Sequence, residues 1–272
     1  MKFKDKLIKA ASINKSWLCV GLDPDLQKMP DMLEKSPDGI RQFLKAIIDS
    51  TKDLVCAYKP NSAFYEQFGA EGIALLKEII DYIPDNIPVI LDAKRGDIGN
   101  TSKMYAITAF ESLGADAITV HPYMGIDSVG PFLDYEDKGV FILCLTSNPS
   151  SGDFQKQVVG DSNMFYKLVA ETALKWNKND NVGLVVGATR AEELKGVRKI
   201  AGEHVPILIP GVGAQGGDLE QSLLNGGNKS GQLAIINVSR SVLYPSKDND
   251  YAEKSWTEAQ NLVSSIRSIL NL

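Results

Sequence analysis

The chain has 272 residues, of which 44% are hydrophobic and 23% are charged, and its formal net charge at pH 7 is −5. These values are ordinary for a globular protein, and a small negative charge without long like-charged runs does not indicate a nucleic-acid-binding surface. No apolar stretch approaches the roughly 18 residues of a membrane-spanning helix, so we expect no membrane contact. The length suits one large α/β domain.

The cysteines are Cys19, Cys56 and Cys144, and each lies within an apolar run. An odd count without paired spacing does not indicate a disulfide framework. Buried reduced thiols are typical of cytosolic proteins, so we expect a cytoplasmic protein. Residues 1–17 lack the apolar core of a signal peptide and have the pattern of an amphipathic helix.

Eight short apolar segments alternate with longer segments of helical periodicity. Most of the eight are apolar at consecutive positions, which is typical of parallel strands covered on both faces. The expected strands are Trp17–Leu22, Leu54–Tyr58, Val89–Leu91, Ala117–Val120, Val140–Leu145, Val182–Val186, Ile207–Ile209 and Leu233–Val238. The expected helices are Ile40–Leu54, Gly72–Ile83, Asn100–Leu113, Met164–Trp176, Arg190–Ala201, Asp218–Leu224 and Ala252–Leu270, with a weaker pattern over Gly125–Tyr135.

This alternation fits either a closed barrel or an open, doubly wound sheet. Eight strands in a chain of about 250 residues favour the barrel. The first strand ends in Gly21-Leu22-Asp23-Pro24 and lacks the Gly-x-Gly-x-x-Gly fingerprint of a dinucleotide-binding open sheet. We therefore predict the α/β class and a single (β/α)8 TIM barrel, with residues 1–272 forming one domain. Active sites of such barrels lie at the carboxyl ends of the strands.

Charged side chains stand at these strand ends. Asp92 and Lys94 lie two residues apart after the third strand, so they should share a face, and Lys59 at the neighbouring strand end can reach them. Asp97 lies just beyond, where the chain turns toward a helix. The four charges could simply pair at a barrel rim. Because charges that converge away from water are costly unless they serve a purpose, we favour a functional array.

A second group of residues is typical of phosphate binding. Four glycines, Gly211, Gly213, Gly216 and Gly217, follow the seventh strand, and Arg240 follows the eighth. Glycines let a backbone approach a ligand, and a guanidinium can bind a phosphate through two hydrogen bonds. A flexible turn and a surface arginine are the alternative, but barrels often bind phosphate at these two strand ends.

We expect no metal site. The chain has two histidines, which disfavours a histidine-based centre. Asp23, Asp92 and Asp97 could ligate magnesium, but Lys94 between two of them already supplies a cation. His121, which precedes a proline at the end of the fourth strand, could contact a ligand or be a packed structural residue.

The segment LDAKRGDIGNTSKMYA, from Leu91 to Ala106, resembles the signature of the orotidine 5′-phosphate decarboxylase family, in its longer bacterial (type 2) branch. Six further motifs resemble the same branch and occur in the same order along the chain. They are GLDP at Gly21–Pro24, YKPNSAFYE at Tyr58–Glu66, VHPYMG at Val120–Gly125, LTSNPS at Leu145–Ser150, PGVGAQGGD at Pro210–Asp218 and NVSRS at Asn237–Ser241.

The resemblance implies decarboxylation of orotidine 5′-monophosphate (OMP) to UMP and CO₂, the last step of de novo UMP biosynthesis, without a cofactor. It implies that Lys94 protonates the C6 carbanion left when CO₂ departs. Asp92 would lie beside the substrate carboxylate, and Lys59 and Asp97 would complete the catalytic array. Loss of CO₂ leaves an electron pair that the pyrimidine π system cannot delocalise, so electrostatic stabilisation has to replace a cofactor.

The resemblance also implies the binding residues. Asp23 and Lys59 match ribose-hydroxyl binders, Gln215 and Arg240 match the phosphate binders, and Ser147 matches a pyrimidine contact for which Thr146 and Asn148 are adjacent candidates. Asp97 and Thr101 match residues that reach the neighbouring ribose across a dimer interface, which implies a homodimer.

Two other functions are compatible with these residues. A related barrel that acts on a sugar phosphate, such as a keto-gulonate phosphate decarboxylase or a hexulose phosphate synthase, would share the Asp-x-Lys-x-x-Asp pattern but use magnesium. A nucleotide-binding barrel without catalysis would bind UMP and show no turnover. The complete set of Lys59, Asp92, Lys94 and Asp97 argues against the second alternative.

Overall fold

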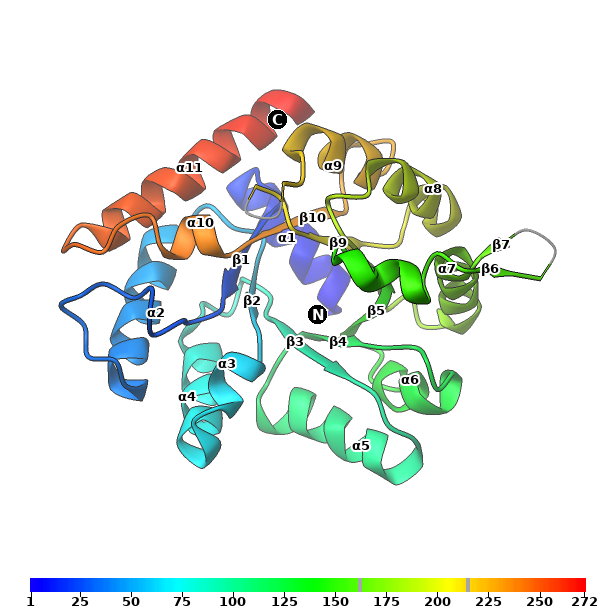
Figure 1. Ribbon diagram of the computed structural model, residues 1–272, viewed down its shortest axis with the longest axis horizontal. Coiled ribbons are helices and arrows are strands. Elements are labelled where there is room, and N and C mark those ends of the chain that lie inside the picture. Colours follow the sequence, from blue (N-terminus) through cyan, green and yellow to red (C-terminus); the bar gives the residue numbers. More distant parts are fainter. Residues whose placement is uncertain (161–162, 214–215) are drawn as a thin grey trace.

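Eight parallel strands wrap into a nearly closed barrel in the computed structural model, which describes residues 1–160, 163–213 and 216–272 (Figure 1). The strands are β1 (Leu18–Leu22), β2 (Ala57–Pro60), β3 (Ile90–Arg95), β4 (Ala117–Val120), β5 (Gly139–Leu145), β8 (Val182–Val186), β9 (Ile207–Pro210) and β10 (Ala234–Val238). They are hydrogen-bonded in the order β2-β1-β10-β9-β8-β5-β4-β3. Parallel bridges from Tyr58 to Val89 and from Asn61 to Asp92 then bring β2 beside β3. The predicted TIM barrel is confirmed.

Helices cover the outside of the barrel (Figure 1). They are α2 (Pro37–Thr51), α4 (Gly69–Tyr82), α5 (Gly99–Ile107), α6 (Ile126–Leu133), α7 (Phe165–Trp176), α8 (Ala191–Ala201), α9 (Leu219–Gly226) and α11 (Tyr251–Leu270). Shorter elements are α3 (Ala63–Glu66), α10 (Arg240–Leu243), the π-helical turn η1 (Thr108–Ser112), the 3-10 turn η2 (Pro149–Asp153) and the hairpin strands β6 (Val158–Val159) and β7 (Asn163–Met164). Among the described residues, no helix is long and apolar enough to cross a membrane.

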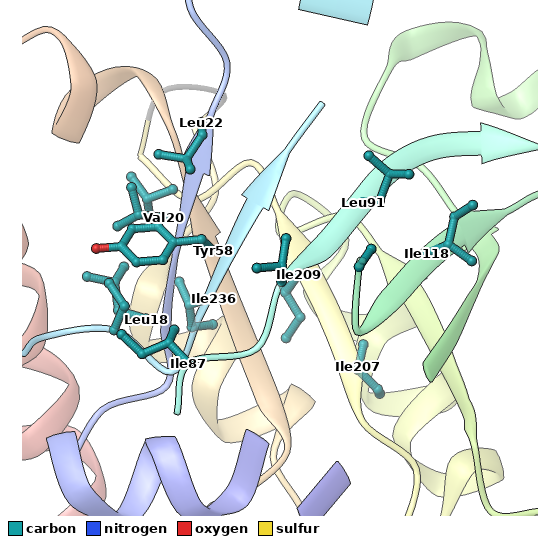
Figure 2. Close-up of a cluster of buried hydrophobic side chains, with 14 of the residues drawn as sticks. Leu18, Val20, Leu22, Tyr58, Ile87, Leu91, Ile118, Ile207, Ile209 and Ile236 are labelled. Atoms are coloured by element: carbon teal, nitrogen blue, oxygen red, sulfur yellow. The ribbon is translucent and has the colours of Figure 1, made fainter. Parts of the chain in front are cut away.

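The strands bury side chains on both faces, which explains their consecutive apolar residues. One set, which includes Leu18, Val20 and Leu22 of β1, belongs to the larger cluster, and Figure 2 shows part of it. The alternate set, which includes Cys19, Ile90 and Phe141, forms a second cluster with the first helix of the chain. Because neighbouring residues of a strand point to opposite faces, this second set fills the barrel interior.

Helix α1 (Phe3–Asn14) closes the end of the barrel where the strands begin, and Figure 1 shows it behind the centre of the ring. The rings of Phe3 and Phe141 meet edge to face, with centroids 5.6 Å apart. Phe141 finds room because Gly183 on β8 has no side chain: a Cβ there would lie 2.5 Å from the phenyl ring. The interior below the strand ends is therefore a packed apolar floor.

The predicted boundaries were wrong at the second strand. We predicted Leu54–Tyr58, whereas β2 covers Ala57–Pro60. Residues 54–56 are buried in the segment that leads from α2 into the core, and the Cys56 N–H already donates to the carbonyl of Leu18 on β1 at 2.7 Å, directly before β2 begins. The shift places Lys59 within the strand, paired in register with Gly21 of β1.

Arg198 of α8 is a buried cation that joins several elements. Its guanidinium donates hydrogen bonds to the carbonyl oxygens of Gly226 at the end of α9, of Gly202 and Val205 before β9, and of Leu233 before β10, at 2.5–3.2 Å. Burial lowers its pKa to about 10. Backbone carbonyls thus take the place of a carboxylate partner.

We expect Arg198→Met to lower the free energy of unfolding by about 3 kcal/mol, because several buried carbonyls lose donors. Urea denaturation at pH 7 measures the effect. Arg267→Met is the matched control, since Arg267 also donates to two carbonyls, of Asn14 and Lys15, but from a partly exposed position. Equal losses for the two variants would contradict a special role for the buried guanidinium.

Candidate active site

A cavity of about 630 Å³ opens at the carboxyl ends of the barrel strands. The described residues that line it include eight predicted site residues or alternatives for them on five different strand ends. These residues are Asp23, Lys59, Asp92, Lys94, Thr146, Ser147, Asn148 and Arg240. Gly211 and Val212 of the glycine-rich segment also line the cavity. Gln215, the other predicted phosphate binder, lies outside the described residues.

Asp92 is the centre of the charged group. Its Oδ2 atom lies 2.8 Å from the ammonium of Lys59, and its Oδ1 atom lies 2.6 Å from the ammonium of Lys94. Lys59 is 3% exposed and Asp92 is 9% exposed. The Lys94 side chain, in contrast, is 48% exposed and faces the cavity. Both lysines line the cavity, but Lys94 is far more exposed to it than Lys59.

The charge states of this group follow from burial and mutual attraction. Burial alone would raise the pKa of Asp92, but the charges of Lys59 and Lys94 outweigh it and hold that pKa well below its ordinary value of 3.8. Burial alone would lower the pKa of Lys59, but Asp92 and Asp23 outweigh it and raise that pKa above its ordinary value of 10.5. At neutral pH the buried pair is charged.

Asp23 is held by residues that the sequence analysis did not single out. The Tyr244 hydroxyl donates to the carbonyl of Asp23 at 2.8 Å and accepts from the N–H of Asp25 at 2.6 Å. The Tyr65 hydroxyl donates to the carbonyl of Leu22 at 2.9 Å. Among the described residues, Oδ1 of Asp23 is buried and has no hydrogen-bond partner. The turn is thus fixed while one carboxylate oxygen remains available.

The three candidates after β5 differ in their contacts. The Thr146 hydroxyl donates to the side-chain oxygen of Asn148 at 2.6 Å, and the Thr146 N–H donates to Gln155 at 2.7 Å. Ser147 lies against Gly187, where a Cβ would come within 2.9 Å of it. All three residues line the cavity.

Asp97 and Thr101 do not line the cavity of their own chain. Asp97 accepts a hydrogen bond from the N–H of Ile98 at 2.8 Å, and Thr101 is exposed in the first turn of α5. The chain therefore brings Lys59, Asp92 and Lys94 together as predicted, and it places Asp97 outside this group.

His121 lies apart from the charged cavity. It borders a separate, mainly apolar cavity next to α7, and its imidazole occupies the space above Gly96, where a Cβ would lie 2.1 Å from Nε2. Its Nδ1 atom is buried and has no hydrogen-bond partner among the described residues, so both interpretations of His121 stay open. Within the described ranges, no three His, Cys, Asp or Glu side chains are grouped so that they could hold a metal ion.

Thr119 is a buried polar residue of the site that the sequence analysis missed. It lies on β4, two residues after the interior residue Ala117, and it borders the cavity. Its Oγ1 atom lies 2.9 Å from Oδ1 of Asp92 and 3.0 Å from the backbone nitrogen of Lys94. A threonine in an apolar strand carries no sequence signal of this kind, because threonine is common in strands for its shape alone.

The chain thus has a TIM barrel with a lysine–aspartate–lysine group in a cavity at the strand ends. This places it in the class of TIM-barrel enzymes, which bind their substrates at that end of the barrel. A family model described as "Orotidine 5'-phosphate decarboxylase / HUMPS family" matches residues 16–254. An orotidine 5′-phosphate decarboxylase of Herpetosiphon aurantiacus is 51% identical over 259 residues, which is 95% of this chain and 95% of that protein. One of Cupriavidus necator is 48% identical and covers 100% of this chain and 98% of its own length.

Solved structures agree with these relatives. The structure of Leishmania donovani OMP decarboxylase superimposes with a TM-score of 0.89 at 44% identity and covers all of both chains. The chain belongs to the orotidine 5′-phosphate decarboxylase family, as the seven motifs indicated.

The buried ion pairs make the stability of the protein depend on pH. Because the pKa of Asp92 in the folded protein lies below 3.8, its charge stabilises the fold above that pH, and the contribution is lost as the pH falls further. We expect Asp92→Asn to lower the free energy of unfolding by about 3 kcal/mol at pH 7, since it leaves the buried Lys59 without its carboxylate. Urea denaturation between pH 3 and pH 7 should show the difference shrinking below pH 3.8.

Asp81→Asn is the control for this experiment, because Asp81 pairs with Lys77 on the exposed face of α4. Its effect should stay below about 1 kcal/mol. An Asp92→Asn variant as stable as the wild type at pH 7 would contradict the stabilising role of the buried pair.

Proposed function

We propose that Lys94 protonates C6 of the substrate when this enzyme converts OMP to UMP and CO₂. In this reaction the C6–carboxylate bond breaks, its electron pair stays on C6, and CO₂ leaves. The Lys94 ammonium then gives its proton to C6, which yields UMP and a neutral amine. The observation that carries the proposal is the 2.6 Å contact that holds this ammonium beside a buried carboxylate at the cavity floor.

The exposure of Lys94 supports a complete catalytic cycle. After each turnover the lysine has to recover one proton, and its side chain is half exposed toward a cavity that opens to solvent. Lys59 also lines the cavity, but it is only 3% exposed, so its ammonium has far less access to solvent. We therefore assign proton transfer to Lys94 and a fixed electrostatic role to Lys59.

Asp92 has two possible roles in this scheme. It could repel the substrate carboxylate, a repulsion that disappears as CO₂ leaves, or it could hold Lys94 charged and oriented. The second role is supported by the contacts of Asp92, because both of its oxygens are engaged by ammonium groups. An ionised Asp92 favours the charged form of its neighbours, which is the form that can donate a proton.

The remaining cavity residues would bind the rest of the nucleotide. We propose that Asp23, whose buried Oδ1 has no partner among the described residues, and Lys59 bind ribose hydroxyls. Arg240, with Gln215, would bind the phosphate, and Ser147 would contact the pyrimidine. Binding energy from the remote phosphate can then be used to position C6 against Lys94.

We also propose that the enzyme is a cytoplasmic homodimer in which Asp97 and Thr101 act on the partner's active site. Neither residue lines the active-site cavity of the chain that carries it, and Asp97 is followed directly by the exposed Ile98. Other large apolar side chains exposed on the same end of the barrel, after β4, are Tyr123, Met124 and Ile126. An interface at this end of the barrel would bury these exposed apolar side chains. The free, buried cysteines support a cytoplasmic location.

Turnover of OMP by the purified protein tests the chemistry. Absorbance should report loss of OMP by the wild type in the presence of EDTA, and Lys94→Ala should be slower by at least about a thousandfold, because it loses both the proton donor and the positive charge. UMP binding, measured by calorimetry, should persist in the variant. A folded wild type that binds UMP but does not turn over OMP would contradict the proposal.

Mixed dimers test the role of Asp97. A Lys94→Ala chain and an Asp97→Ala chain, carried on different affinity tags and purified together, should form a dimer with one intact site and about half of the wild-type activity. The control dimer combines Lys94→Ala with Asp92→Asn, which disables both sites if those residues belong to the same chain. A Lys94→Ala/Asp97→Ala dimer as inactive as the control would place Asp97 in the site of its own chain.

A further inference from the structure

The Thr119 hydroxyl connects the catalytic carboxylate with the backbone of the catalytic lysine. Thr119 is 1% exposed, so this hydroxyl is shielded from bulk water. The backbone N–H of Lys94 can only donate, so Oγ1 of Thr119 accepts at 3.0 Å. The hydroxyl proton is then available for Oδ1 of Asp92, at 2.9 Å. Oδ1 is also the oxygen that contacts the Lys94 ammonium.

Lys94 needs this contact because its backbone is unusual. Its φ angle is +45°, in the left-handed region that residues with a side chain rarely adopt. The regular pairing of β3 with β4 is interrupted between Leu91 and Arg95, so the Lys94 N–H does not follow the regular ladder. The Thr119 hydroxyl thus accepts a hydrogen bond from a backbone N–H that the strand pairing does not satisfy. Strained residues of this kind persist where their surroundings hold them in place.

We propose that Thr119 is a positioning residue for the decarboxylation: it holds the Lys94 backbone in its strained conformation and orients the Asp92 oxygen that receives the Lys94 ammonium. This inference rests on the function proposed above for Lys94. Thr119 acts through Lys94 and Asp92, and it has no direct part in the chemistry. Because Lys94 stabilises charge that develops only as CO₂ leaves, its displacement raises the barrier of the chemical step and leaves ground-state binding largely intact.

Substitutions that separate the hydroxyl from the shape of the side chain test the proposal. Thr119→Val keeps the shape and removes the hydroxyl, and Thr119→Ser keeps the hydroxyl and removes the methyl group. We expect Thr119→Val to lower kcat by roughly tenfold to a hundredfold, the scale on which small misplacements act, while KM for OMP and the Kd of UMP stay close to the wild-type values. Thr119→Ser should restore most of kcat.

Thr51→Val is the matched control. Thr51 is also fully buried, and its hydroxyl contacts the Ile47 carbonyl and the Tyr58 hydroxyl, both at 2.7 Å, but it lies on α2 outside the cavity. We expect both Thr51→Val and Thr119→Val to reduce the melting temperature, but Thr51→Val should leave kcat unchanged. If Thr119→Val does not fold, Thr119→Ala and Thr119→Ser can be compared instead, because they also differ by the hydroxyl group.

Two results would overturn the proposal. The first is a kcat for Thr119→Val (or Thr119→Ala) equal to that of the wild type. The second is a kcat lowered equally in the Ser variant, which would assign the effect to packing of the methyl group. Either result leaves the role of Lys94 intact, because that role fails only if the wild type does not turn over OMP or if Lys94→Ala remains active.

Discussion

The buried contact between Lys59 and Asp92 is the constraint on which the rest of the site depends. Two charges enclosed in a protein are unfavourable unless each is neutralised and hydrogen-bonded at close range. Here the carboxylate of Asp92 is shared between the ammonium groups of Lys59 and Lys94 and also accepts from Thr119. Lys59 lies on β2, Asp92 and Lys94 lie on β3, and Thr119 lies on β4. The site therefore exists only when these three neighbouring strands are in register.

The barrel supplies the surroundings that make these charges effective. Below the charged layer lie interior side chains such as Ala57, Ile90 and Ala117, and below them α1 closes the barrel. An apolar floor keeps water away from one side of the array, so electrostatic interactions there are stronger than they would be at a surface. The opposite side is the open cavity, where a substrate would replace the remaining water. Lys59 is nearly enclosed beside this floor, whereas the Lys94 side chain is half exposed toward the cavity.

The same arrangement explains why the site is divided among so many segments. The ribose, pyrimidine and phosphate of a nucleotide lie several ångströms apart, and the residues proposed to bind them, Asp23, Ser147 and Arg240, follow β1, β5 and β10 around the rim. The strand ends hold these groups at fixed spacing without any one loop having to span the ligand. Tyr65 and Tyr244 also lie outside the charged group. Their hydroxyls donate to the carbonyls of Leu22 and Asp23 and so fix the turn that carries Asp23.

The sequence by itself determined the barrel, the order of its strands and the position of the Asp92 and Lys94 motif at their ends. These properties depend on local patterns: consecutive apolar residues indicate a strand buried on both faces, and Asp92 and Lys94 lie two residues apart on one of them. Only the tertiary structure decided the rest. The late start of β2, the φ of +45° at Lys94, the enclosure of Lys59 and the contacts of Thr119 all depend on how strands distant in sequence pair and where that pairing is interrupted. The register between strands is set by packing of the whole barrel, so no segment of the chain carries it alone.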